Sequence, residues 1–138
     1  MYERVLVALD HSETSQRVLK VAKELATAAG SEVWVVHLRE REVIAQLGNV
    51  ANESDLEAQS GVEQAVEELK KAGVNAHGEV REALFGHAAR EIVEDAKSHD
   101  ASIIILGSRG RSEISSLLVG SVAHKVLHLA DRPVLVVR

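Results

Sequence analysis

Short apolar runs alternate along this chain with longer segments in which apolar residues recur every three or four positions. A short run bounded by turn residues is typical of a buried strand, and the longer spacing is typical of a helix with one face in a core. The run at residues 5–9 is followed by such a segment, which includes Val18, Ala22 and Ala26 and ends at Gly30. Glycine is a common helix stop, so the first strand and the first helix are predicted from spacing alone.

The same pattern continues to the C-terminus and predicts five strands and four helices in strict alternation. The strands are predicted at residues 5–9, 32–38, 74–80, 102–106 and 134–137, and the helices begin near residues 12, 54, 86 and 116. Residues 39–53 are charged and follow neither spacing, so we expect an irregular loop there. Strict alternation with right-handed crossovers predicts an α/β fold, an open parallel sheet with helices on both faces. The length fits one domain, residues 1–138.

Composition narrows the function classes. The chain is 46% hydrophobic but has only one Phe, one Trp and one Tyr, which suits an aliphatic core around parallel strands. It has no cysteine, which excludes disulfides and thiolate metal sites. No apolar run approaches the length of a membrane span and no signal peptide is evident, so we expect a cytoplasmic protein without a membrane partner. A net charge of −5 and few aromatic residues argue against a nucleic-acid partner.

A spaced set of glycines carries the main functional signal. The pattern Gly107-x2-Gly110-x9-Gly120-Ser121 leaves an apolar strand and runs into an apolar-faced helix. Glycines let backbone N–H groups approach an anion, and a helix start favours negative charge, so the pattern predicts nucleotide binding. The alternative is that Gly107 and Gly110 form a turn and Gly120 a packing contact. Neither the dinucleotide fingerprint nor the P-loop pattern occurs.

These glycines, with Asp10 after the first strand and the closing Arg-Pro-Val-Leu-Val-Val of residues 132–137, resemble the universal stress protein family over the whole chain. The glycine spacing is similar to that of the ATP-binding branch of the family. The resemblance implies a Rossmann-like, five-stranded sheet in the order 3-2-1-4-5, with helices on both faces. The order would reverse between the first and fourth strands, which would place Asp10 beside Gly107.

The resemblance also implies a role for each matched residue. Asp10 is expected to contact ribose, and the backbone of Val36, near the end of the second strand, is expected to meet the adenine edge. The other residues expected in the nucleotide site are Ala8, Leu9 and Leu106 around the base, and Gly107, Arg109, Gly110, Gly120, Ser121 and Val122 around the triphosphate. Mg²⁺ or Mn²⁺ is expected to accompany ATP through the phosphate oxygens. Two departures from the family pattern are His11, where glycine is frequent, and Gly86-His87-Ala88, where Gly-x-Pro is frequent.

The final strand suggests a partner. Val134–Val137 is apolar throughout, and in the implied strand order it lies at a sheet edge, where unpaired backbone groups favour pairing with a second copy of the chain. A homodimer is therefore expected, as the family resemblance also implies. The alternative is a short free edge flanked by Arg132 and Arg138. An additional protein partner is expected but is not identified by any motif.

Three function classes stay open at this point. The first is a stress-response module whose ATP-bound state regulates a partner, and the second is a slow ATPase, for which only Arg109 and His11 are candidate charges. The third is an interaction protein that holds no ligand. No catalytic residue is predicted, because Asp10 has no evident carboxylate partner and no Gly-x-Ser-x-Gly elbow occurs. His124 and His128 have metal-chelating spacing but no identifiable third ligand, so they are interpreted as surface or dimer-contact residues.

Overall fold

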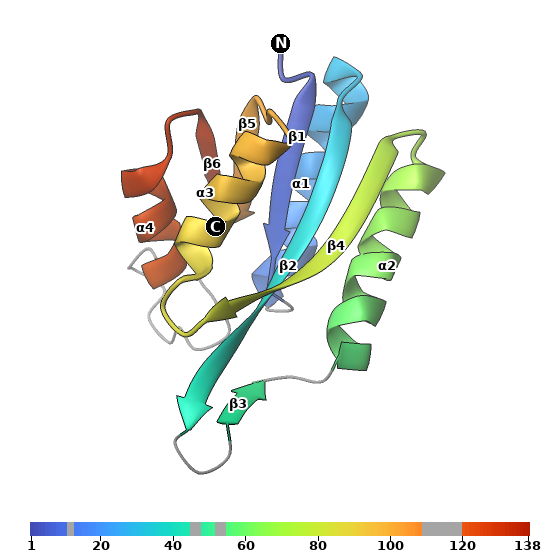
Figure 1. Ribbon diagram of the computed structural model, residues 1–138. Helices are drawn as coiled ribbons and strands as arrows, with labels where there is room; N and C mark the ends of the chain where they lie inside the picture. Colours follow the sequence, from blue (N-terminus) through green and yellow to red (C-terminus); the bar gives the residue numbers. More distant parts are fainter. Residues whose placement is uncertain (11–12, 45–47, 52–54, 109–119) are drawn as a thin grey trace.

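The computed structural model describes residues 1–10, 13–44, 48–51, 55–108 and 120–138 (Figure 1). Strands and helices follow one another along the chain with a single interruption, where two strands are consecutive. The elements are β1 (Arg4–Leu9), α1 (Glu13–Ala29), β2 (Glu32–Ile44), β3 (Gly48–Ala51), α2 (Asp55–Lys71), β4 (Asn75–Leu84), α3 (Ala88–Ser98), β5 (Ile103–Gly107), α4 (Ser121–Leu129) and β6 (Val134–Val137). No helix in these ranges is long and apolar enough to cross a membrane.

Five of the strands form a parallel sheet in the order β4-β2-β1-β5-β6. When only the parallel strands are numbered along the chain, this is the predicted order 3-2-1-4-5, so the fold prediction is confirmed. The central strand β1 lies between β2 and β5, and Ala8 is opposite both Val36 and Leu106. The strand order reverses at β1, and such a reversal is where open α/β sheets bind ligands.

The predicted loop at residues 39–53 is wrong. Strand β2 continues to Ile44, pairs with β4 as far as Arg41 opposite Leu84, and then pairs with the antiparallel β3. Because Arg41 is also opposite Ala51, β3 and β4 lie on opposite sides of β2, and the β2–β3 hairpin projects beyond the rest of the sheet (Figure 1). The charged sequence lacks an apolar period, but neighbouring strands supply the backbone hydrogen bonds that keep it extended.

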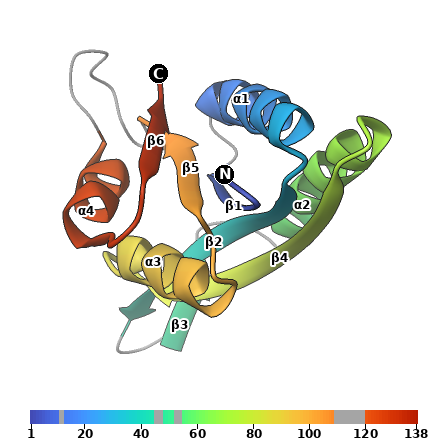
Figure 2. The same cartoon turned by 90° about the horizontal axis from the view of Figure 1, so that it is seen from above.

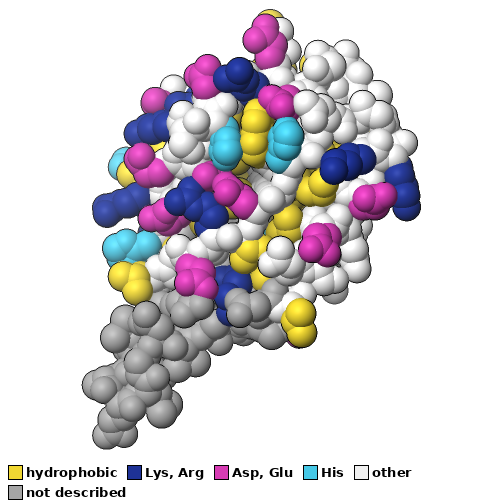
Figure 3. Space-filling view, turned by 45° about the vertical axis from the view of Figure 1, so that its right-hand side comes forward, with side chains coloured by type: hydrophobic (Ala, Val, Ile, Leu, Met, Phe, Trp, Pro, Cys, Tyr) yellow, Lys and Arg dark blue, Asp and Glu magenta, His cyan; other side chains and the backbone are white. Residues whose placement is uncertain are grey.

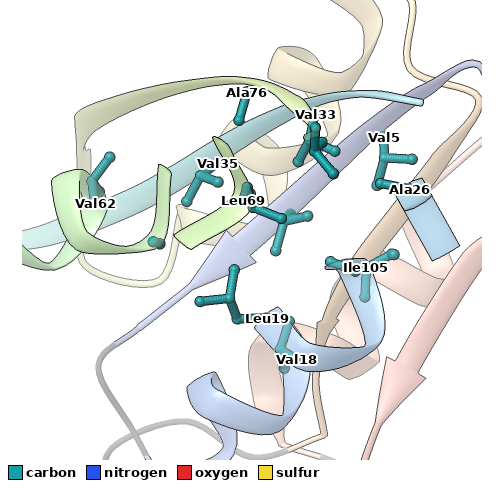
Figure 4. Close-up of a cluster of buried hydrophobic side chains, with 14 of the residues drawn as sticks. Val5, Val18, Leu19, Ala26, Val33, Val35, Val62, Leu69, Ala76 and Ile105 are labelled. Carbon is teal, nitrogen blue, oxygen red and sulfur yellow. The ribbon is translucent and has the colours of Figure 1, made fainter. Parts of the chain in front are cut away.

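The helices form one layer on each side of the sheet (Figure 2). Helices α1 and α2 pack on the face that carries Val5, Val33 and Ile105, and Figure 4 shows this core. Helices α3 and α4 pack on the opposite face, which carries Leu6 and Ile104. Because successive strand residues point to opposite faces, each buried strand contributes to both cores, and both are built from aliphatic side chains as the composition predicts.

Candidate functional site

The carboxyl ends of β1 and β5 meet at the point where the strand order reverses. The register places Ala8 opposite Leu106, so Leu9 and Asp10 extend beside Gly107 and Ser108. Asp10 follows the last residue of β1, and Gly107 is the last residue of β5. The structure therefore brings together two predicted site residues that are nearly 100 positions apart in the sequence. Together with Ser108 and Gly120, they define what we call the carboxyl-edge site.

Asp10 is held by the first turn of α1. The hydroxyl of Ser15 donates a hydrogen bond to Asp10 Oδ1 at 3.0 Å. The backbone N–H of Asp10 donates to the same hydroxyl at 3.2 Å. These two contacts orient the carboxylate at a helix N-terminus, where negative charge is favoured. A carboxylate accepts about four hydrogen bonds, so the bond from Ser15 does not by itself exclude bonds from a ligand.

Gly107 packs closely against the same helix. A Cβ atom at this position would lie 3.3 Å from Cβ of Thr14 and 3.4 Å from Cγ2 of Val18, tighter than most side chains tolerate. This close approach gives Gly107 a packing role against α1, which neither the ligand-binding prediction nor the alternative of a turn included. Because both roles require glycine, a substitution at this position cannot separate packing from binding.

Helix α4 begins next to Gly107. The backbone N–H of Gly120 donates to the carbonyl of Ser108, and the N–H of Ser108 donates to the carbonyl of Val137 at 2.7 Å. Gly120 precedes α4 as a buried N-cap residue and makes no side-chain capping bond. Ser121 and Val122 follow in the first turn. The positive end of the α4 dipole therefore lies near the end of β5, as a phosphate site requires.

Two residues of this site were missed by sequence reasoning. Ser108 is 5% exposed and connects the end of β6 to the start of α4. His37 is 2% exposed, and its Nδ1 lies 2.6 Å from the carbonyl oxygen of Leu9, so Nδ1–H donates to that carbonyl. His37 thus fixes the end of β1 one residue before Asp10. Adjacency to Gly107 was the only sequence signal for Ser108, and none marked His37.

Of the other predicted site residues, some lie in the buried core and some lie outside the described residues. Leu106 and Val36 are fully buried in the core under α3 and α4, and Ala8 lies beside them in the sheet. The expectation that Val36 lies near the end of its strand is wrong, because β2 continues to Ile44 and pairs with β1 and β4 on either side of Val36. Its contact with adenine stays a prediction. Arg109, Gly110 and His11 lie outside the described residues.

The whole chain, residues 1–138, matches the universal stress protein family. The chain belongs to this family. Universal stress protein YxiE from Bacillus subtilis is 32% identical, with 100% of both chains covered. Universal stress protein MJ0577 from Methanocaldococcus jannaschii is 31% identical, with 100% of this chain and 96% of the relative covered.

Solved structures show the same fold in this universal stress protein's relatives. The structure of MJ0577 aligns with a TM-score of 0.82 at 27% identity and covers 99% of this chain and 96% of the other. The universal stress protein from Archaeoglobus fulgidus, solved in complex with dAMP, aligns with a TM-score of 0.75 at 28% identity. That alignment covers 99% of this chain and 98% of the other.

Proposed function

We propose that this universal stress protein binds ATP at the carboxyl-edge site and acts as a nucleotide-dependent regulatory module in a stress response. One observation carries the proposal: the β1–β5 register brings Asp10 and Gly107 to the same edge of the sheet, where α1 begins beside Asp10 and α4 begins beside Ser108. The relative from Archaeoglobus fulgidus, whose structure contains dAMP, supports an adenine nucleotide as the ligand.

In this proposal the residues divide between the parts of the nucleotide. Asp10 accepts hydrogen bonds from the ribose hydroxyls, because an ionised carboxylate is an acceptor only. The backbone N–H groups at the start of α4 bind the phosphates. The base lies against Ala8, Leu9, Val36 and Leu106, and the phosphates lie against Gly107, Arg109, Gly110, Gly120, Ser121 and Val122. Mg²⁺ or Mn²⁺ binds through the phosphate oxygens. The proposal does not include ATP hydrolysis, because the two candidate charges for that reaction, Arg109 and His11, lie outside the described residues.

The direct test is to denature the purified protein, identify any released nucleotide by chromatography, and measure ATP binding to stripped protein by calorimetry. We expect released adenine nucleotide and one ATP site per chain, with GTP unable to displace ATP at comparable concentration. The expected preference for adenine follows from a base site without a side chain that accepts from a guanine amino group. Absence of binding to the stripped, folded protein would leave only the interaction-protein interpretation.

We also propose that β6 forms a homodimer interface. The N–H of Ile104 donates to the carbonyl of Pro133, and the N–H of Ser108 donates to that of Val137. In a parallel pair the backbone N–H and C=O groups of successive residues point alternately toward and away from the neighbouring strand. Those of Val134 and Val136 therefore point away from β5. Exposed leucines lie nearby: Leu135 is 37% exposed, and Leu127 and Leu129 are each 48% exposed. Two antiparallel β6 strands would satisfy these backbone groups and bury apolar surface.

The dimer is tested by Val136→Pro, which removes an N–H that does not bond to β5. We expect the parent protein to sediment as a dimer at micromolar concentration, and the variant to shift toward monomer without losing its fold. Val136→Ala keeps the N–H and is the matched control, which should stay dimeric. Sedimentation of the parent protein as a monomer would refute this interface.

A further inference from the structure

A second group of ionisable side chains lies between β4 and α3. Glu79 comes from β4, Asp95 lies on α3, and His99 is the C-cap residue that follows α3. One potential ligand atom from each of these three residues lies within 4.8 Å of the others. Nε2 of His99 is 3.5 Å from Oε1 of Glu79 and 3.8 Å from Oδ1 of Asp95. We call these three residues the acid–histidine cluster.

Asp95 has an oxygen that lacks a hydrogen-bond donor. Its side chain is 3% exposed, and Oδ1 accepts a hydrogen bond from Nη1 of Arg81. Oδ2 is buried and has no hydrogen-bond partner within the part of the chain that the structure describes. A buried carboxylate oxygen without a donor is costly, so Oδ2 needs either a proton or a cation.

The surrounding charges favour a cation. Besides Asp95, Arg81 pairs with Glu91, whose Oε2 lies 3.3 Å from Nη2. The third carboxylate, Glu79, lies beside Asp95 in the cluster, so three carboxylates and one guanidinium meet in this part of the described structure. The local excess of two negative charges matches a divalent ion. Figure 3 shows histidine, acidic and basic side chains gathered on this face of the molecule.

The types of donor atom indicate which cation fits. One imidazole nitrogen with two carboxylate oxygens suits Zn²⁺ and similar first-row ions, whereas Mg²⁺ and Ca²⁺ prefer oxygen ligands alone. Ligands about 2.0 to 2.1 Å from a tetrahedral ion lie about 3.4 Å apart, close to the separations seen around His99. The His99 ring stacks on Trp34, with centroids 4.8 Å apart, which restrains the ring plane. Side-chain exposures of 26% for His99 and 40% for Glu79 leave the cluster open to solvent.

We propose that Glu79, Asp95 and His99 bind one divalent cation of the Zn²⁺ class. The bound ion would connect the edge strand β4 to the C-terminal end of α3. It would also give the Asp95 carboxylate, whose Oδ2 has no hydrogen-bond partner among the described residues, a second cationic partner besides Arg81. The competing possibility is that Asp95 and Glu79 share a proton and the cluster binds no metal. The proposal is independent of the nucleotide site, because neither Asp10 nor the glycines take part.

The test is calorimetric titration with Zn²⁺ of protein in which His124 and His128 are both changed to Gln, so that this exposed pair on α4 does not contribute. We expect one equivalent of Zn²⁺ to bind and Ca²⁺ not to compete. Asp95→Asn and His99→Gln should each weaken Zn²⁺ binding by at least about ten-fold. Glu79→Gln, at a half-exposed position, should likewise weaken Zn²⁺ binding.

The matched control is His77→Gln. His77 also stacks on Trp34, at 5.2 Å, but its Nε2 pairs with Glu32 at 2.9 Å outside the cluster. This change should alter Zn²⁺ affinity by less than about two-fold, because a ring outside the ligand set affects affinity only indirectly. Trp34 is the single tryptophan, so quenching of its fluorescence by Ni²⁺ gives a second readout. That quenching should be lost in His99→Gln and kept in His77→Gln.

Two results would overturn the proposal. One is the absence of Zn²⁺ binding below millimolar concentration in the protein with His124→Gln and His128→Gln but an intact cluster, which would favour the shared proton. The other is equal Zn²⁺ affinity with and without Asp95→Asn or Glu79→Gln, all measured in protein that also carries His124→Gln and His128→Gln. This result would place any bound ion elsewhere. Thermal melts of every variant in chelator establish that each is folded before it is titrated.

Discussion

The carboxyl-edge site is built mainly from backbone groups, whereas the acid–histidine cluster is built from side chains. At the carboxyl edge the described groups are the backbone at the start of α4, two glycines and the carboxylate of Asp10. Between β4 and α3 they are side chains, with Arg81 paired to Glu91 and Asp95 and with Glu79 beside Asp95. The difference teaches that a polyphosphate is accommodated where side chains are absent and N–H groups converge, whereas a metal ion requires side-chain ligands held by packed elements.

The strongest test of this difference is Gly120→Val. Gly120 has an extended backbone, with φ −61° and ψ 159°, that valine adopts readily. Because the position is buried, a thermal melt must first show that the variant is folded. The added methyl groups would occupy the space in which phosphate approaches the N-terminus of α4. We expect ATP affinity measured by calorimetry to fall more than about 100-fold, or about 2.7 kcal/mol. An unchanged affinity would mean that the start of α4 does not bind phosphate.

A smaller effect is expected from Asp10→Ala. Removing a hydrogen bond to a charged group costs about 1.5 to 3 kcal/mol, so ATP affinity should fall by roughly 10- to 150-fold. The variant should also lose the preference for ATP over its dideoxy analogue. Ser15→Ala removes only the group that orients the carboxylate and should cost less, about 0.5 to 1.5 kcal/mol. Equal discrimination between the two nucleotides in parent and variant would remove Asp10 from the ribose.

The acid–histidine cluster is expected to make stability depend on pH. Burial raises the pKa of Asp95 to about 6, and the neighbouring carboxyl group of Glu79 acts in the same direction, while the hydrogen bond and charge of Arg81 act against them. Because the unfolded pKa is about 3.9, the folded state binds more protons between these values. The contribution of Asp95 to the free energy of unfolding should therefore fall by about 1 to 3 kcal/mol as the pH rises from about 4 to above 6.

Asp95→Asn isolates this effect, because it removes the titrating group and keeps the other titratable and charged groups around it. These are Glu79 and Arg81 on β4, Glu91 on α3, and His99 at the C-cap of α3. Urea unfolding in chelator at several pH values should show a parent-minus-variant difference that changes across this range. A constant difference would show that Asp95 titrates normally.

The smallest expected effect concerns independence of the two sites. Gly120→Val should leave Zn²⁺ affinity within about two-fold of the parent value, and Asp95→Asn should do the same for ATP affinity. The two sites share no residue and lie on different strands. A loss of Zn²⁺ affinity in Gly120→Val together with a loss of ATP affinity in Asp95→Asn would show that the two sites are coupled.

Strand β2 illustrates where prediction from the sequence stopped. Its apolar half, with Val33, Val35 and Val36, was predicted because consecutive apolar residues mark a buried strand. Its charged half was predicted as a loop, since nothing local distinguishes an extended charged segment from an irregular one. Pairing with β3 and β4 decided the outcome, and the same extension placed Val36 well inside the strand.

The amino-acid sequence by itself determined the alternation of strands and helices, the aliphatic cores and the glycine at the end of β5. Each of these depends on the spacing of apolar residues and glycines over a few neighbouring positions. The position of Asp10 beside Gly107 needed the strand order as well, which the family resemblance supplied. Only the tertiary structure brought Glu79 to Asp95 and His99, and His37 to the carbonyl of Leu9. Those contacts join residues from separate elements, and their distances depend on how strands pair and helices pack rather than on any local pattern.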